Sequence, residues 1–249
     1  MRQTTWVAIA AVLAALWPAV PAGAQAGCAA PASLSLTRRP MPHVAAVLGR
    51  GGALDVLALG SASLLGEHGG VAGSVPDRMA QALRAAQPQA AVTLTLRAGR
   101  TLSAEEMLAT LQRELAAHRY QLVLWQTGSV EALRRLPVAP FRATLAAGVT
   151  AAQQAGADLV LIDMQFSRLL DRSADLAPYR AAMTEAALQP GVMLFPRYAL
   201  MRAWAEDGQL DLEASPRPDR RRALAQLRAC LGEALARMLG AAVPAGGRS

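Results

Sequence analysis

Short, continuous apolar runs alternate with helix-periodic segments along most of this chain, and this alternation limits the fold more than any other feature. Strands that are apolar without interruption are typical of parallel sheets buried on both faces. Strand–helix alternation at this spacing predicts helices on both sides of such a sheet. We therefore expect a single three-layer α/β/α domain with about five parallel strands. The strand-like runs are Leu54–Leu59, Ala91–Arg97, Gln121–Trp125, Asp158–Ile162 and Val192–Phe195.

Helical periodicity fills the segments between these runs. Ser103 and Glu106 form a capping box, in which each side chain satisfies a free backbone donor of the other residue, and this marks the start of one helix. Gly156 is a plausible stop for another. The other expected helices are Val75–Gln87, Phe141–Gln154, Ala177–Leu188, Tyr198–Glu206 and Asp219–Leu239.

The first 24 residues have the pattern of a secretory signal peptide. Arg2 gives a positive start, residues 6–16 are apolar, and Ala22-Gly23-Ala24 is a small-x-small cleavage site. The apolar run is too short to span a membrane, so we expect a periplasmic or secreted chain with no transmembrane segment after cleavage. The expected divisions are a signal peptide (1–24), an N-terminal arm (25–50), the α/β domain (51–240) and a flexible tail (241–249).

The two cysteines, Cys28 and Cys230, would meet an oxidising compartment after export. A bridge between them would tie the N-terminal arm to the last helix, and closing so long a loop is worth about 4–5 kcal/mol in the chain-entropy model. A lipid anchor at Cys28 is the alternative, although Gln25 stands where lipoprotein sites normally carry an aliphatic residue.

All 25 basic residues are arginine, because the sequence contains no lysine. The formal net charge is +7, but only 4% of the residues are aromatic. With so few rings to stack on bases, and with export expected, we exclude nucleic acid as a partner. An Arg cluster at the start of the last helix is either a solvated surface or a docking surface for an anionic partner. Its members are Arg217, Arg220, Arg221 and Arg222.

Ligands of parallel α/β sheets bind beyond the carboxyl ends of the strands, and this rule selects the candidate site residues. They are Ser61, Ala62 and Ser63 after the first strand, Gly99 after the second, Gln126, Thr127, Gly128 and Glu131 after the third, and Asp163 and Gln165 after the fourth. His68 could reach them from a Gly-rich loop, and Glu131 and Asp163 could form a carboxylate pair. Each residue has a structural alternative as a helix cap or turn residue. No spacing matches a metal site, and we expect no cofactor.

Four segments in this order carry a resemblance to a known family. They are Leu59-Gly60-Ser61-Ala62-Ser63-Leu64-Leu65-Gly66, Leu122–Gly128, Leu159–Gln165, and Met193–Arg197 with Met201-Arg202. Together they resemble the nucleophile block and later strands of the SGNH/GDSL hydrolases over residues 54–239. The resemblance implies a flavodoxin-like fold and ester hydrolysis or acyl transfer. In that chemistry a serine attacks the acyl carbon of the ester, and a His–Asp pair accepts the proton of the serine hydroxyl. Backbone and side-chain donors of Gly and Asn stabilise the oxyanion that forms.

The chain departs from this family at the residues that carry the chemistry. Ala62 stands at the position of the serine, and Val130 at that of the oxyanion asparagine, in a sequence without any asparagine. The stretch that should hold the catalytic Asp and His is Ala214–Asp219, and no histidine follows His118. Of the family's two oxyanion donors, only the glycine has a counterpart in this chain, at Gly99.

These losses predict a degenerate member of the family, because triad residues act as a unit and removing one costs several orders of magnitude in rate. We expect an inactive protein that binds an acylated glycan or other cell-envelope component in the former crevice. One alternative is an esterase or acyltransferase that uses Ser61 or Ser63. Another is a structural partner that docks through the Arg-rich last helix.

Overall fold

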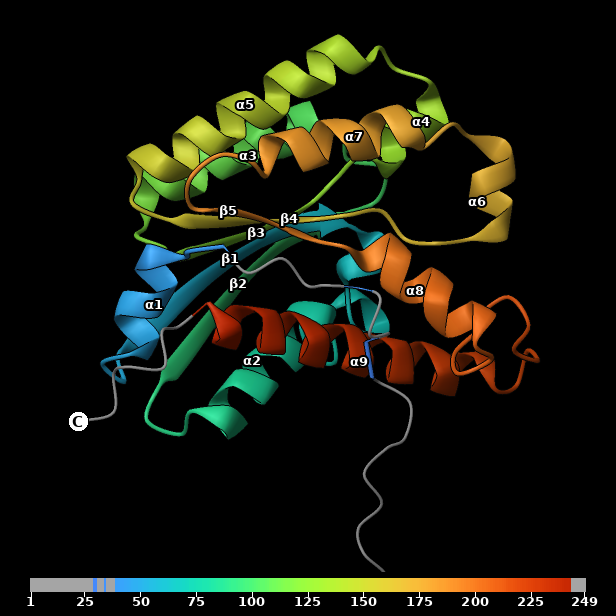
Figure 1. Ribbon diagram of the computed structural model, residues 1–249, viewed down its shortest axis with the longest axis horizontal. Coiled ribbons are helices and arrows are strands. Elements are labelled where there is room, and N and C mark those ends of the chain that lie inside the picture. The colour runs from blue at the N-terminus through green and yellow to red at the C-terminus, as the bar shows by residue number, and fades with distance from the viewer. Residues whose placement is uncertain (1–28, 31–33, 35–38, 243–249) are drawn as a thin grey trace, which may run out of the picture.

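Five parallel strands form one sheet in the order β2-β1-β3-β4-β5 (Figure 1). The computed structural model describes residues 29–30, 34 and 39–242. Within them the expected α/β fold class is confirmed, with the strand order of a flavodoxin-like sheet. The strands are β1 (Ala53–Ser61), β2 (Ala91–Gly99), β3 (Leu122–Gln126), β4 (Asp158–Ile162) and β5 (Val192–Phe195).

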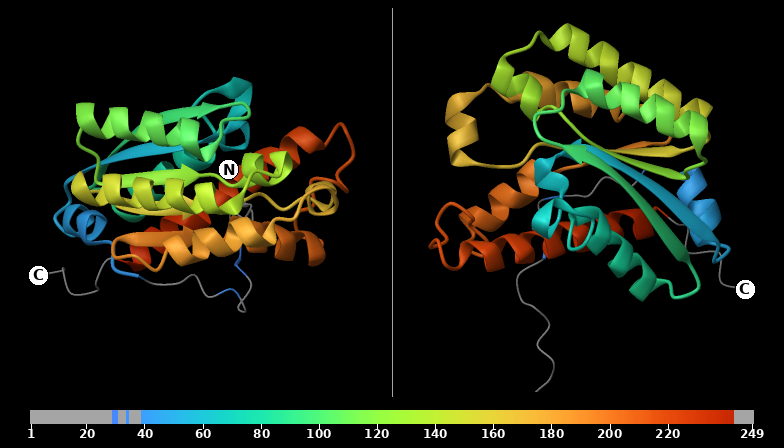
Figure 2. Two further views of the ribbon diagram at one scale, coloured as in Figure 1. Left: turned by 90° about the horizontal axis from the view of Figure 1, so that it is seen from above. Right: turned by 180° about the vertical axis from the view of Figure 1, so that it is seen from behind.

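Helices cover both faces of the sheet (Figures 1 and 2). One face packs against α1 (Pro42–Leu48), α2 (Val75–Ala86), α8 (Arg197–Glu206) and α9 (Arg220–Ala241). The other packs against α3 (Ala104–Ala117), α5 (Val138–Gln154) and α7 (Ala177–Ala186). The short elements η1 (Ala62–Leu64), η2 (Glu67–Gly69), α4 (Ser129–Arg134) and α6 (Arg168–Ser173) follow the carboxyl ends of β1, β3 and β4.

The strands read as continuous apolar runs because their side chains alternate between two hydrophobic layers. In β1, Leu54, Val56 and Ala58 belong to the core under α2 and α9, whereas Leu57 and Leu59 belong to the core under α3 and α5. All residues of β3 and β4 are buried in the same way. In β3 and β4, the polar side chains are therefore confined to the strand ends, at Gln126 and Asp158.

The predicted bounds of β4 and β5 agree with the structure, and β1 continues two residues past Leu59 to Ser61. Helix α1 was not predicted, because its 7 residues are about two turns and too short to establish a helical period. It lies in the segment that we expected to be an arm. Val44 is buried in the core, and its backbone amide donates a hydrogen bond to Asp158 Oδ2 at 2.8 Å.

Residues 1–28, which include the expected signal peptide and Cys28, lie outside the described residues, so the Cys28–Cys230 bridge stays a prediction. Cys230 is buried in the same hydrophobic layer as Trp204 of α8. Trp204 Nε1 donates a hydrogen bond to the carbonyl oxygen of Ala29 at 3.0 Å. The residue that follows Cys28 therefore lies on the face of the sheet that α9 covers. No helix in the described part of the chain is long and apolar enough to cross a membrane.

Helices α2 and α9 cross most closely at Gly232. A Cβ atom at this position would lie 2.4 Å from Arg78 Cβ and 2.7 Å from the backbone nitrogen of Met79. We expect Gly232→Ala to lower the free energy of unfolding by about 2 kcal/mol, because two backbones must move apart. Denaturant unfolding followed by circular dichroism measures this change.

Gly240→Ala on the same helix is the matched control. Nothing lies within 4 Å of a Cβ at Gly240, so this change should be neutral or stabilise the protein by up to about 1 kcal/mol. Equal effects of the two substitutions would contradict the close crossing at Gly232.

Candidate functional site

Three polar side chains meet where β1 and β3 end, and we call them the Ser–Gln cluster: Ser61, Ser63 and Gln126. Ser61 Oγ and Ser63 Oγ lie 3.0 Å apart. Gln126 Nε2 donates to Ser61 Oγ at 3.0 Å, and Ser63 Oγ donates to Gln126 Oε1 at 3.3 Å. The parallel register of β1 and β3 brings the two strand ends together. Gly60 leaves room for the amide, since a Cβ there would lie 3.0 Å from Gln126 Oε1.

Ala62 occupies the centre of this edge. It is exposed, whereas Ser61 and Ser63 on either side are half-buried and Gln126 is buried. Gly99, the last residue of β2, pairs directly with Ser61 in the sheet. The structure thus assembles the residues expected after the first, second and third strands, with the methyl group of Ala62 at the position where the sequence analysis expects the nucleophile.

Arg197, the first residue of α8, lies under the Ser–Gln cluster, and our sequence analysis did not select it. Its side chain is 4% exposed, and its Nη1 donates a hydrogen bond to Ser63 Oγ at 3.1 Å. Burial lowers the pKa of Arg197 to about 10; the charge of Asp163 opposes this shift and that of Arg228 adds to it. Its sequence signals were its place two residues after the end of β5 and its position in the Met193–Arg197 segment of the resemblance. Neither signal marks one arginine among 25 as a site residue.

Asp163, the residue after β4, is buried and paired with arginine. Its Oδ2 accepts from Arg180 Nε at 3.1 Å, and its Oδ1 accepts from the backbone amide of Met164 at 2.7 Å. Burial raises the pKa of Asp163, and the Arg180 guanidinium offsets part of the increase. The Arg180 guanidinium also lies 4.1 Å from the ring centre of Tyr198. This carboxylate is held by its own partners and makes no hydrogen bond to either serine.

Glu131 does not join Asp163 in a carboxylate pair. It is buried and caps two helices at once: it accepts hydrogen bonds from the backbone amide of Ala104 at the start of α3 and from that of Gly128 before α4. These amides are free donors at helix N-termini, where a negative charge is favourable. Glu131 therefore serves as a helix cap, which is the structural alternative that the sequence left open for it.

The remaining candidates line the edge without forming an acid–base set. Thr127 is buried, and no partner for its Oγ1 is found among the described residues. Beside Gly128 the crevice is filled, because a Cβ there would lie 2.6 Å from Met164 Cε. Gln165 is partly buried in the segment after β4. Within the described part of the chain, no group of three or more His, Cys, Asp and Glu side chains could hold a metal ion.

Among the described residues, no hydrogen bond joins any of the three histidines to Ser61 or Ser63. His68 is exposed in η2 with a left-handed backbone (φ 58°), and no hydrogen bond of its side chain is found among the described residues. His118 ends α3, and His43 of α1 lies near Gly156, so both are at the opposite, amino edge of the sheet. The structure therefore supplies neither Ser61 nor Ser63 with a histidine base.

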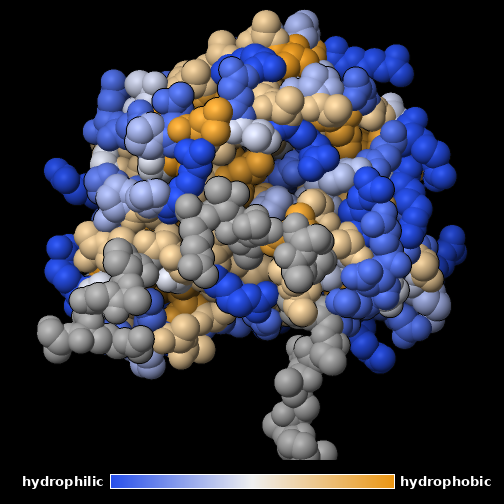
Figure 3. All heavy atoms as spheres, viewed as in Figure 1, coloured by the Kyte–Doolittle hydropathy of each residue, from blue (hydrophilic) through white to orange (hydrophobic). Residues whose placement is uncertain are grey.

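The segment just before Ala214–Asp219, the stretch where the family's Asp and His are expected, is tied to α6. Arg168 Nη2 donates to Asp211 Oδ2 at 2.7 Å, and Ser167 Oγ donates to Glu213 Oε1 at 2.7 Å. The Arg168 bond lowers the pKa of Asp211, and the Ser167 bond lowers that of Glu213. Polar side chains gather on this side of the molecule (Figure 3). The stretch Ala214–Asp219 follows, mostly exposed.

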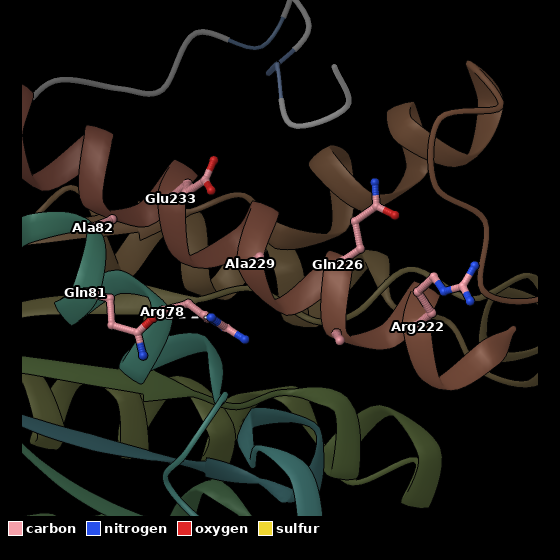
Figure 4. A pocket seen from close by; sticks show the side chains of 8 residues that line it. Arg78, Gln81, Ala82, Arg222, Gln226, Ala229 and Glu233 are labelled. Carbon is pink, nitrogen blue, oxygen red and sulfur yellow. Dashed lines mark hydrogen bonds between the residues drawn. The ribbon is translucent and has the colours of Figure 1, made fainter. Parts of the chain in front are cut away.

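One cavity lies beside this edge, and a second lies on the face of the sheet that α2 and α9 cover. The first, of about 440 Å³, is lined by Glu106, Glu131, Arg134 and Phe141 among others. The second is a groove of about 630 Å³ between α2 and α9 (Figure 4). Arg78 and Gln81 line it from α2, and Arg222, the member of the Arg cluster at this groove, lies near the start of α9.

The role of Glu131 can be tested through stability. We expect Glu131→Ala to lower the free energy of unfolding by about 2–4 kcal/mol, because two buried backbone donors lose their acceptor. Glu131→Gln should cost less, since one amide oxygen still accepts. Glu105→Ala is the control: this exposed carboxylate lies in the first turn of α3, and its loss should change stability by less than about 0.5 kcal/mol. A Glu131→Ala variant as stable as Glu105→Ala would contradict the capping role.

Two solved structures that share this fold are esterases. The psychrotrophic esterase EstA from Pseudoalteromonas sp. aligns with a TM-score of 0.53 and 18% identity, over 75% of this chain and 98% of that one. An acetyl xylan esterase from Geobacillus stearothermophilus aligns with a TM-score of 0.60 and 15% identity, over 75% and 94% of the two chains. At these identities the likeness shows the fold alone.

No curated protein matches the chain in sequence. The model of the Non-GDSL lipase-like family does match, over residues 27–245, which is most of the chain. This match agrees with the SGNH/GDSL resemblance at the strand ends and with the folds of the solved esterases. The chain therefore belongs to the Non-GDSL lipase-like family and has the α/β fold of the SGNH/GDSL hydrolases.

Proposed function

We propose that this protein is a non-hydrolytic member of its family that binds an acylated glycan or another cell-envelope component at the carboxyl edge of β1, β3 and β4. One observation carries the proposal. The exposed residue at the nucleophile position is Ala62, and the serines on either side are hydrogen-bonded to Gln126 and Arg197 rather than to a base.

This arrangement lacks a group that can accept the proton of a serine hydroxyl. Serine attacks an ester efficiently only when a neighbouring base accepts its proton. The guanidinium of Arg197 only donates hydrogen bonds, and Asp163 is held by Arg180 and the Met164 amide. Arg197 contacts Ser63 and could stabilise an anionic oxygen, which is the one feature that favours the esterase alternative. Without a base, this contact favours binding over turnover.

The ligand class rests on analogy with the fold neighbours, one of which is an acetyl xylan esterase. The edge that we propose to bind the ligand offers polar groups of a suitable kind. The hydroxyl groups of Ser61 and Ser63 are half-buried and can donate to or accept from sugar hydroxyl and acyl oxygen atoms. The exposed Ala62 methyl group leaves the position of the family's nucleophile open to a ligand.

The experiment that tests this proposal is serine-directed fluorophosphonate labelling of the purified protein, read by peptide mass spectrometry and paired with an ester-hydrolysis assay. We expect neither labelling of Ser61 or Ser63 nor turnover, because no base activates either hydroxyl. Ala62→Ser should also stay inactive for the same reason. An active esterase of the same fold, treated identically, is the positive control. Labelling of either serine, with turnover lost when that serine becomes alanine, would overturn the proposal in favour of the esterase alternative.

We also propose that the protein is exported and that a signal peptidase removes residues 1–24. Expression of the full chain in a bacterial host should then yield a periplasmic form that begins at Gln25, because Ala22-Gly23-Ala24 fits the cleavage site. N-terminal sequencing and intact mass measure this start. Replacing Ala24 by a bulky residue is the control and should block processing. A membrane-bound form acylated at Cys28 would instead support the lipoprotein alternative.

A further inference from the structure

We infer that the edge beside Ala62 contains an anion-binding subsite, in which Arg197 and Ser63 hold an oxyanion group of the ligand. The chemistry is that of a carboxylate or a phosphate, each of which presents several acceptor oxygen atoms to a guanidinium. This inference rests on the proposed function, because it names the charged part of a ligand that binds in the same crevice.

The first argument is an unbalanced buried charge. Arg197 is 4% exposed and makes no ion pair with any described carboxylate. Asp163 is the carboxylate whose charge acts on Arg197, and it is already bonded to Arg180. Burying a guanidinium without a bonded counter-charge is costly, and natural proteins keep such costs mainly at functional sites. A ligand oxyanion would supply the missing negative charge.

The second argument is an excess of hydrogen-bond donors. The Nε atoms of both Arg197 and Arg228 are buried, and the structure gives them no acceptor among the described residues. Buried donors are almost always satisfied, and an anion with several lone pairs can satisfy more than one. Ser63 Oγ accepts from Arg197. Its hydrogen is directed to Gln126 Oε1 at 3.3 Å and would turn from that oxygen to the ligand.

The third argument is the balance of charges around Arg197. The charges that act on Arg197 are that of Asp163, which is already bonded to Arg180, and that of Arg228, which is itself positive and faces Glu67. Arg197 is therefore left without a carboxylate of its own, beside the exposed Ala62. A neutral glycan has no need of this charge, whereas an acidic sugar or a phosphate group would be favoured by it.

The test is isothermal titration of the purified protein with inorganic phosphate, with D-glucuronate and with neutral D-glucose, all at one ionic strength set with chloride. We expect saturable binding of phosphate, glucuronate or both, and at least tenfold weaker binding by Arg197→Met, because hydrogen bonds to a charged group are lost. The anion that binds more tightly identifies the source, phosphate or carboxylate.

Arg202→Met is the matched control, since it removes the same charge from the same helix at an exposed position paired with Glu206. It should leave anion binding unchanged. Ser63→Ala keeps the guanidinium and should weaken anion binding severalfold, so the subsite can be tested even when Arg197→Met does not fold. A circular dichroism spectrum and an unfolding curve for each variant separate lost binding from lost structure.

Two outcomes would overturn the subsite: binding of neither anion, or anion binding that neither Arg197→Met nor Ser63→Ala weakens. These results do not depend on catalysis. Serine labelling with ester turnover would overturn the non-hydrolytic function and leave a measured anion site standing. Saturable glucose binding without anion binding would overturn the subsite and leave the binding function standing.

Discussion

Burial of a parallel sheet on both faces is the constraint on which the rest of this structure depends. The inner strands β3 and β4 are completely buried, so a polar side chain can be placed only where a strand ends. All strands run in the same direction, and their carboxyl ends therefore deliver Ser61, Gln126 and Asp163 to one edge. The helices that cover the faces supply the other members of the site, above all Arg197 at the start of α8.

The ionisable group that contacts a serine at this edge is an arginine and not a base. A hydrolase needs a base near its nucleophile and donors for the oxyanion. Here the exposed position holds Ala62, and the neighbouring Ser63 hydroxyl accepts a hydrogen bond from a buried guanidinium. Such a group recognises negative charge but does not remove protons. At this edge, the fold of the family thus places a buried guanidinium against a serine hydroxyl.

The carboxylates show how the same residue type takes different roles in different surroundings. Glu131 is directed to two backbone amides at helix N-termini, so its charge stabilises α3 and α4. Asp163 is directed to Arg180, which in turn lies over the Tyr198 ring. Each carboxylate is committed to structural partners, and neither faces Ser61 or Ser63. Because both are tied to groups on different elements, they also fix the positions of α4, α7 and α8 around the edge.

The sequence by itself determined the sheet, most helices and the positions that follow the strands, because burial imposes periodic patterns that local composition reveals. It also predicted the loss of the hydrolase set, from Ala62 at the expected serine position and from the absence of any asparagine. Only the tertiary structure decided that Glu131 is a cap and that α1 packs into the core. It alone selected Arg197 from among 25 arginines. The reason is physical: burial and hydrogen bonding between residues as distant as Ser63 and Arg197 depend on three-dimensional packing and leave no periodic signal along the chain.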